Sequence, residues 1–338
     1  MKLGNSGAAD AALVETSPSD SMEATSDTSF IQRVCIPLLR SAQNEDGGWG
    51  FHPRSQSRVE PACWALLALL NSSPSQDIEA RIARGFRFLH AAQLPDGSWP
   101  SSPAERTGCW VSSLACWILS FERDDSKALE AGLKWVCKDW PRDSTLWSRL
   151  LRKLSSGRDI LPQNDSYRGW GWTPRTSSWV EPTSFALIAL SRGPSGKLPN
   201  NAQRRRQLAE AMLYDRMCPG GGWNCGNPMI YGVPGEPLVI PTVWALLALR
   251  DYPQRAENVL SLDWLEKDLE SIHGPGSLTL ARICIEAYGR KWPVSAPQLC
   301  DFHRKNAFLQ HIPVIAWACL ACGTREHWLA DASQENPQ

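Results

Sequence analysis

The stretch that decides the fold is Gln93-Leu-Pro-Asp-Gly-Ser-Trp99, because a copy of it stands 50 residues earlier, at Gln43-Asn-Glu-Asp-Gly-Gly-Trp49. Two degenerate copies follow, at Tyr167–Trp172 and Cys218–Trp223. A repeat of about this length is typical of one supersecondary unit stacked on itself. The sequence therefore predicts a repeat architecture, in which each copy is a Gly-Trp turn.

An apolar run follows three of these turns, at Glu60–Leu69, Glu181–Leu190 and Ile240–Leu249, and the second turn is followed by Trp110–Trp117. The three runs carry a proline near their start, where a helix does not need the missing N–H. Because they are apolar almost all round, we expect buried helices. The segments before the turns, such as Arg84–Ala92, mix apolar and basic residues at helical spacing, which predicts outer helices with one wet face.

Each unit is then an outer helix, a Gly-Trp turn and an inner helix. Four clear units cover residues 30–72, 80–122, 128–192 and 203–251, and two weaker ones follow with apolar runs at Leu278–Ala287 and Ile312–Leu320. Six such hairpins suit an all-α double-layered ring, an α6–α6 toroid. The expected organisation is a disordered segment 1–28, one toroid 29–325 and a polar tail 326–338.

The composition narrows the classes of function that we expect for the protein. The formal net charge is zero and the pI is near 7, so no nucleic-acid partner is expected. No signal peptide is visible, and no apolar stretch approaches the roughly 20 residues that span a bilayer. The 11 cysteines are scattered, several of them inside apolar runs, which suits a reducing compartment. We expect a cytoplasmic protein, and peripheral contact with a membrane stays open.

The string Arg84-Gly-x-x-Phe88-Leu89-x-x-x-Gln93-x-x-x-Gly97-x-Trp99 matches the full QW motif of squalene–hopene and oxidosqualene cyclases, and residues 34–49 match it in part. The apolar runs also resemble the inner helices of that superfamily, which includes the β subunits of protein prenyltransferases. The resemblance implies a ring whose inner helices line a central, largely apolar cavity that holds an isoprenoid or another apolar small molecule.

Aromatic residues fall on the expected inner helices, where they could stabilise a carbocation through the faces of their rings. The expected cavity residues are Trp64, Trp110, Phe185, Trp244 and Trp317. Plain core packing between the two helix layers is the competing interpretation.

The sequence departs from the superfamily at its catalytic motifs. The cyclases start with an Asp-x-Asp-Asp acid, which is absent here; the nearest string is Arg123-Asp-Asp125. The prenyltransferase subunits bind zinc through an Asp and a Cys two apart, and no Asp-x-Cys occurs. We therefore expect neither a metal nor another cofactor.

Three carboxylates remain as candidate acids. Glu60 and Glu181 occupy the same repeat position, just before the inner-helix proline, and Glu236 lies near it in unit four. They could protonate a substrate at one mouth of the cavity. The competing interpretation is that each is an N-terminal helix residue favoured by the macrodipole. Asp46 and Asp96 are turn residues, for which the resemblance implies a capping role.

The loop from Cys218 to Pro241, rich in Gly and Pro, is expected to be a cavity lid, a partner surface or a plain connection. Three functions stay open. The first is a terpene cyclase-like enzyme that works by carbocation chemistry. The second is a non-catalytic toroid that binds an isoprenoid, a lipid or a protein partner. The third is a prenyltransferase β-like subunit.

Overall fold

The computed structural model of the 338-residue chain describes residues 27–122, 127–138, 141, 163–164, 166–194, 196–230, 232–293, 298–305 and 310–321. The segment up to residue 26, the string Arg123-Asp-Asp125, most of the insertion before Tyr167 and the tail after residue 321 lie outside these ranges. The expectations for those parts therefore stay predictions.

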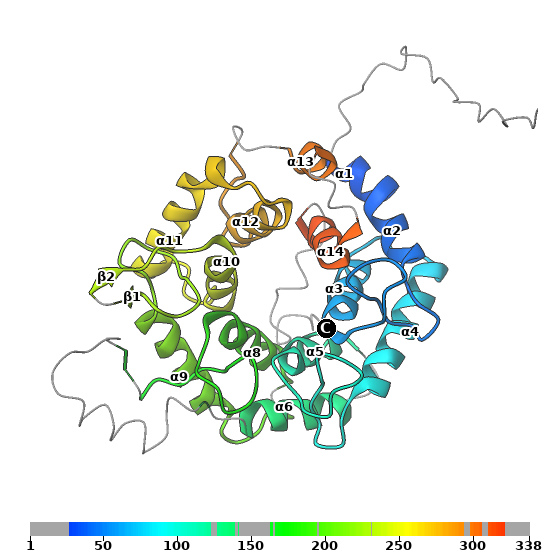
Figure 1. Ribbon diagram of the computed structural model, residues 1–338, viewed down its shortest axis with the longest axis horizontal. Coiled ribbons are helices and arrows are strands. Elements are labelled where there is room, and N and C mark those ends of the chain that lie inside the picture. Colours follow the sequence, from blue (N-terminus) through cyan, green and yellow to red (C-terminus); the bar gives the residue numbers. More distant parts are fainter. Residues whose placement is uncertain are drawn as a thin grey trace, which may run out of the picture.

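The described residues form two concentric layers of helices around one axis (Figure 1). The outer layer contains α1 (Asp27–Phe30), the π-helix η1 (Ile31–Cys35), α2 (Ile36–Ser41), α4 (Gln76–Ala92), α6 (Lys127–Lys138), α9 (Ala202–Asp215), α11 (Ala256–Lys267) and α13 (Leu299–Lys305). The inner layer contains α3 (Val59–Leu70), α5 (Val111–Leu119), α8 (Val180–Arg192), α10 (Val239–Ala248), α12 (Pro275–Ala287) and α14 (Ile312–Ala321). The predicted all-α α6–α6 toroid is confirmed.

Two small elements interrupt this pattern. A short hairpin of β1 (Met229–Ile230) and β2 (Val233–Pro234) precedes α10, with Met229 paired to Pro234. The 3₁₀-helix η3 (Leu269–Ser271) joins α11 to α12. Both lie in connections between an outer and an inner helix.

Burial separates the two layers as the apolar patterns predict. In α3, every residue from Val59 to Leu69 is buried except Glu60, which is half-buried. In α4 only Ile78, Gly85, Phe86 and Leu89 are buried. A helix that is apolar all round can be stable only inside a core, whereas a helix with one apolar stripe covers that core from outside.

The inner helices close into a ring. Each packs against two others, in the order α3, α5, α8, α10, α12, α14 and back to α3. Backbone hydrogen bonds join three inner-helix starts to turns of neighbouring units: Trp110 N–H to Trp172 O (3.1 Å), Val180 N–H to Cys225 O (3.3 Å) and Ile312 N–H to Phe51 O (2.9 Å). The last of these links unit six to unit one. The turns and the inner-helix starts therefore share one end of the ring, called the mouth below.

The Gly-Trp turns hold the two layers together through buried indoles. The indole N–H donates to the last turn of its own outer helix, from Trp49 to Leu39 O (2.7 Å), from Trp99 to Leu89 O (2.7 Å) and from Trp223 to Leu213 O (2.6 Å). In unit three, Trp170 donates to Val136 O (2.8 Å), across the insertion. These four tryptophans are structural.

Two sequence interpretations need correction. The capping role implied for Asp46 is wrong, because its Oδ1 accepts from Gly48 N–H and Ser57 Oγ within the turn and no side chain caps α3. From the sequence alone, the basic run Arg204-Arg205-Arg206 is interpreted as a solvated loop or helix end. Arg205 is instead fully buried in α9, with its guanidinium 4.0 Å from the centre of the Trp170 ring.

Candidate functional site at the mouth of the ring

Two of the three candidate acids stand at equivalent places at the mouth. Glu60 is the second residue of α3, and Glu181 is the second residue of α8. Neither forms a salt bridge in the part of the chain that the structure describes. Both are half-buried where three inner helices, α3, α5 and α8, begin side by side.

Their surroundings favour the neutral acid. Burial raises the pKa of Glu60 from 4.5 to about 7, with a further rise from the charge of Glu181 and a partial offset from the Trp64 indole N–H. Burial also raises the pKa of Glu181 from 4.5 to about 7. Nε1 of Trp64 makes no hydrogen bond of good geometry within the described ranges, so its contact with Glu60 is a weak one. At neutral pH each glutamate therefore holds a proton about half of the time.

The third candidate, Glu236, is placed differently. It is exposed in the loop between β2 and α10, and the position on α10 that corresponds to Glu60 is filled by Ile240. Glu236 therefore lies outside the half-buried setting that Glu60 and Glu181 share.

The predicted aromatic residues come together behind these carboxyls, deeper in the ring. The ring centroid of Trp64 lies 5.2 Å from that of Trp244 and 6.0 Å from that of Phe185, and Phe185 lies 4.9 Å from Trp244. Trp317 joins the cluster at 5.7 Å from Trp64. Trp64 is 1% exposed, and Trp244 is 2% exposed.

This cluster changes the picture of an open central cavity. Helices α3 and α10 stand opposite each other in the ring, yet Trp64 and Trp244 stack on each other. The rings therefore fill the axis at this depth and meet one another across the centre of the inner layer. The sequence reasoning left out Trp117, which is fully buried on α5 and lies 5.9 Å from Trp64. Its signal was its position on an inner helix, seven residues after Trp110.

The fifth aromatic residue, Trp110, lies at the mouth itself. It precedes α5 and takes the repeat position that Glu60 and Glu181 occupy in the neighbouring units. Its ring is half-buried, 5.3 Å from Phe185 and 5.2 Å from Trp172. Sequence reasoning did not single out Trp172, which is two residues past the tryptophan of the third turn.

A pocket of about 460 Å³ opens beside Glu181, between the starts of α8, α10 and α12. Its wall includes Cys225 and Leu238 from the long loop of unit four, and His273 from the turn before α12. Burial, followed by the charge of Glu181, raises the pKa of the Cys225 thiol. The loop from Cys218 to Pro241, for which the sequence leaves a lid, a partner surface and a plain connection open, supplies part of the pocket wall. Neither Cys225 nor His273 stands in a motif that marks it in the sequence.

Metal ligands do not gather in this region. Within the described ranges, no group of three or more His, Cys, Asp or Glu side chains is placed to hold a metal ion. In the same ranges, no helix is both long enough and apolar enough to cross a membrane.

Known proteins share parts of this sequence. Drimenyl diphosphate synthase of Streptomyces showdoensis is 25% identical over 257 residues, which cover 64% of this chain and 46% of the relative. Lanosterol synthase of Homo sapiens is 39% identical over 80 residues, which cover 21% of this chain and 10% of the relative. The chain therefore spans less than half the length of these curated relatives. No protein-family model matches it.

The fold has counterparts among solved structures. Type II terpene cyclase MstE from Scytonema, without a ligand, superposes with a TM-score of 0.51 over 83% of this chain and 78% of that chain, at 12% sequence identity. At that identity the likeness is one of fold. Taken with the sequence matches, it makes the chain a distant homologue of the squalene–hopene cyclase-like terpene cyclases, with their α/α toroid.

Proposed function

We propose that the protein is a terpene cyclase-like enzyme that binds an isoprenoid at the mouth of the ring and starts its cyclisation by proton transfer from a glutamic acid. The observation that carries the proposal is the pair Glu60 and Glu181, two carboxyls at the mouth with a pKa of about 7, of which Glu181 lines a pocket. A general acid must hold its proton at the working pH, and an ordinary glutamate does not.

Glu181 is the preferred donor, because it lines the pocket of about 460 Å³. The Oε–H bond breaks and a new C–H bond forms at one alkene carbon, with the electron pair of the double bond. The other alkene carbon becomes a carbocation, which the next double bond of the chain attacks to close a ring. Loss of a proton from a neighbouring carbon to the Glu181 carboxylate ends the reaction and restores the acid.

Glu60 has a supporting role in this scheme. The charge of Glu181 disfavours a second negative charge on Glu60, so the ionised form of the pair is held back at the mouth. Trp110 lies at the mouth and Phe185 lies one turn after Glu181 on α8, with ring centroids 5.3 Å apart, and we assign to their faces the stabilisation of the developing cation.

The relatives support the reaction class. The two curated matches are named as a drimenyl diphosphate synthase and a lanosterol synthase, and MstE as a type II terpene cyclase. We extend to this chain only the general class, an isoprenoid cyclisation. The exposed side chain of Leu238 gives an apolar substrate a path into the pocket.

The test is incubation of the full chain with squalene, farnesyl diphosphate or geranylgeranyl diphosphate, followed by extraction and gas chromatography–mass spectrometry. A cyclised product that disappears in Glu181→Gln and falls in Glu60→Gln is expected. Glu236→Gln is the matched control, because that glutamate is exposed, and it should leave the product unchanged. Equal product from all three variants would exclude both buried glutamates as the acid.

A second function, a non-catalytic isoprenoid-binding toroid, is favoured by two observations. The stacked rings of Trp64 and Trp244 fill the axis, and the sequence lacks the Asp-x-Asp-Asp motif. This function predicts that the same extraction returns the isoprenoid intact. A protein partner and peripheral membrane contact stay predictions of the sequence.

A further inference from the structure

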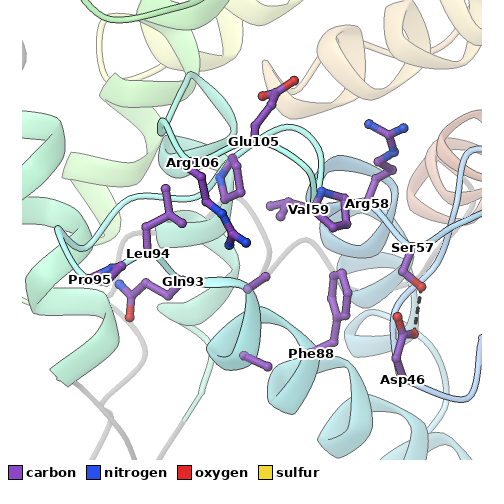
Figure 2. A pocket seen from close by; sticks show the side chains of 14 residues that line it. Asp46, Ser57, Arg58, Val59, Phe88, Gln93, Leu94, Pro95, Glu105 and Arg106 are labelled. Carbon is purple, nitrogen blue, oxygen red and sulfur yellow. Dashed lines mark hydrogen bonds between the residues drawn. The ribbon is translucent and has the colours of Figure 1, made fainter.

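A second pocket, of about 420 Å³, lies between units one and two and is separate from Glu60 and Glu181 (Figure 2). Its walls come from the first Gly-Trp turn and the start of α3, from the end of α4, and from the loop after Trp99. Its volume is within the range of small-molecule sites, roughly 300–1,000 Å³. Nothing in the proposed cyclisation uses it.

One repeat position differs between units one and two beside the pocket. Gly85 and Gly132 are equivalent, since each approaches the tryptophan ring of the preceding turn, and three residues later stand Phe88 and Trp135. Phe88 packs on Gly48 of unit one as Trp135 packs on Gly108 of unit two. The smaller Phe88 lines the pocket, together with the small side chains of Ala91 and Ala92.

The floor of the pocket is apolar and its rim is charged. Figure 2 shows the Arg106 side chain extending into the space between Leu94 and Phe88, while the Glu105 carboxylate points away from Phe88. Arg58 stands at the rim with its guanidinium on the same side as Glu105. Asp46, the other acidic residue of the wall, is occupied by its hydrogen bonds from Gly48 N–H and Ser57 Oγ.

The two arginines have unused hydrogen-bonding capacity. In the part of the chain that the structure describes, neither the Arg58 nor the Arg106 side chain forms a hydrogen bond or a salt bridge, whereas Glu105 accepts from Ser101 Oγ at 2.8 Å. A guanidinium pairs best with a planar or tetrahedral oxyanion such as a carboxylate or a phosphate. A ligand for this pocket therefore needs an anionic head and an apolar body.

We propose that this pocket is a binding site for a small amphiphilic anion, whose phosphate or carboxylate head pairs with Arg106 and whose apolar part packs on Phe88, Val59 and Leu94. Arg58 adds a second, weaker attraction from the rim. The negative charge of the Glu105 carboxylate repels the anion and so lowers the affinity of the pocket for it.

The test uses isothermal titration calorimetry of the full chain with octyl phosphate, with inorganic phosphate and 1-octanol as separate probes. Saturable binding of octyl phosphate is expected, with both fragments at least about tenfold weaker because each lacks one half of the interaction. Inorganic phosphate that binds as tightly as octyl phosphate would contradict the proposed contact of an apolar body with the pocket floor. Octanol that binds as tightly as octyl phosphate would contradict the proposed pairing of an anionic head with Arg106.

Variants locate the site. Arg106→Gln should weaken octyl phosphate at least about tenfold and Arg58→Gln about threefold, whereas Glu105→Gln should strengthen it about threefold. Phe88→Trp, which installs the residue type of Trp135, should fill the pocket and abolish binding while the circular dichroism spectrum stays unchanged. Arg87→Gln is the matched control, because Arg87 is exposed on α4 outside the pocket.

Wild-type affinity in both Arg106→Gln and Phe88→Trp would refute the site. Binding to Glu181→Gln separates this proposal from the proposed function. Octyl phosphate should bind that variant as it binds the wild type, and loss of binding there would place the anion at the mouth instead.

Discussion

Glu60 and Glu181 make the stability of the protein depend on pH. Their pKa values are about 7 in the folded chain, against 4.5 when unperturbed. Between these values the folded state binds more protons than the unfolded state, so stability falls as pH rises from about 4.5 to about 7 and then levels off. A shift of this size corresponds to about 3 kcal/mol for each glutamate.

Urea unfolding at several pH values between about 5 and 8 checks this expectation. The double variant Glu60→Gln, Glu181→Gln should lose most of the slope and be more stable than the wild type at about pH 8. Glu236→Gln, which changes an exposed carboxylate, should keep the wild-type slope. A double variant with the full slope would assign the pH dependence to other groups. Because the two glutamates interact, the effects of the single variants are not expected to add.

Gly97 stands at a position where the backbone conformation and the neighbouring helix favour glycine. Its φ is +90°, and a Cβ there would lie 2.6 Å from the carbonyl oxygen of Ala131 on α6. Gly97→Ala should therefore cost about 2–4 kcal/mol, from the left-handed backbone and from the displaced outer helix. Thermal unfolding measures it, with Gly196→Ala as the control because a Cβ at Gly196 meets nothing within 4 Å. Equal losses in both variants would contradict this reading of the turn.

Some single residues could not be predicted from the sequence. The raised pKa values of Glu60 and Glu181 come from burial at the mouth, whereas their repeat position was visible in the chain. Arg205 is buried in α9, and its guanidinium lies over the Trp170 ring. A charge run gives no sign that one member is buried, because the ring that stabilises it comes from the Gly-Trp turn of the preceding unit.

The connection between the Gly-Trp turn and the inner helix is held by the same type of hydrogen bond in three units. The backbone N–H of the turn tryptophan donates to a hydroxyl on the inner helix, from Trp99 to Ser112 (2.9 Å), from Trp170 to Thr183 (2.9 Å) and from Trp223 to Thr242 (2.8 Å). All three hydroxyl residues are buried. They connect the end of the turn to the first turn of the next helix.

Removing one of these hydroxyls tests this connection. Thr183→Val keeps the shape of the side chain but leaves the Trp170 N–H without its acceptor, so a loss of about 1–3 kcal/mol is expected in urea unfolding. Thr107→Val, at an exposed site in the loop before α5, should stay within about 0.5 kcal/mol of the wild type. A similar small change in Thr183→Val would show that water or a rearranged turn replaces the hydroxyl.

The helices were predictable because the features that predict them, the apolar runs and the turns or prolines that bound these runs, are both local in the sequence. The apolar runs that start at Glu60, Glu181 and Ile240 became α3, α8 and α10, and each helix starts one residue before the predicted run. The filled axis was not predictable. Whether Trp64 reaches Trp244 across the ring depends on the ring diameter, which is set by the packing of all six inner helices and by no single segment.

At the scale of the whole molecule, ring closure distinguishes this protein from an open repeat array. In an open array, the end repeats have one neighbour and can unfold alone. Here α14 packs on α3, and Trp64 contacts Phe185, Trp244 and Trp317 on three other inner helices. Loss of any one unit removes contacts from the shared centre, so the units should unfold together.

Urea unfolding followed by two probes tests this cooperativity. Near-ultraviolet circular dichroism reports the tryptophan cluster, far-ultraviolet circular dichroism reports the helices, and their midpoints should coincide. Trp64→Ala should lower both midpoints together, by about 3–5 kcal/mol in the free energy of unfolding. A cluster signal that disappears before the helices melt would mean that the centre can open while the ring persists. An isoprenoid could then reach the axis, and the substrate would be placed among the rings of Trp64 and Trp244 instead of beside Glu181.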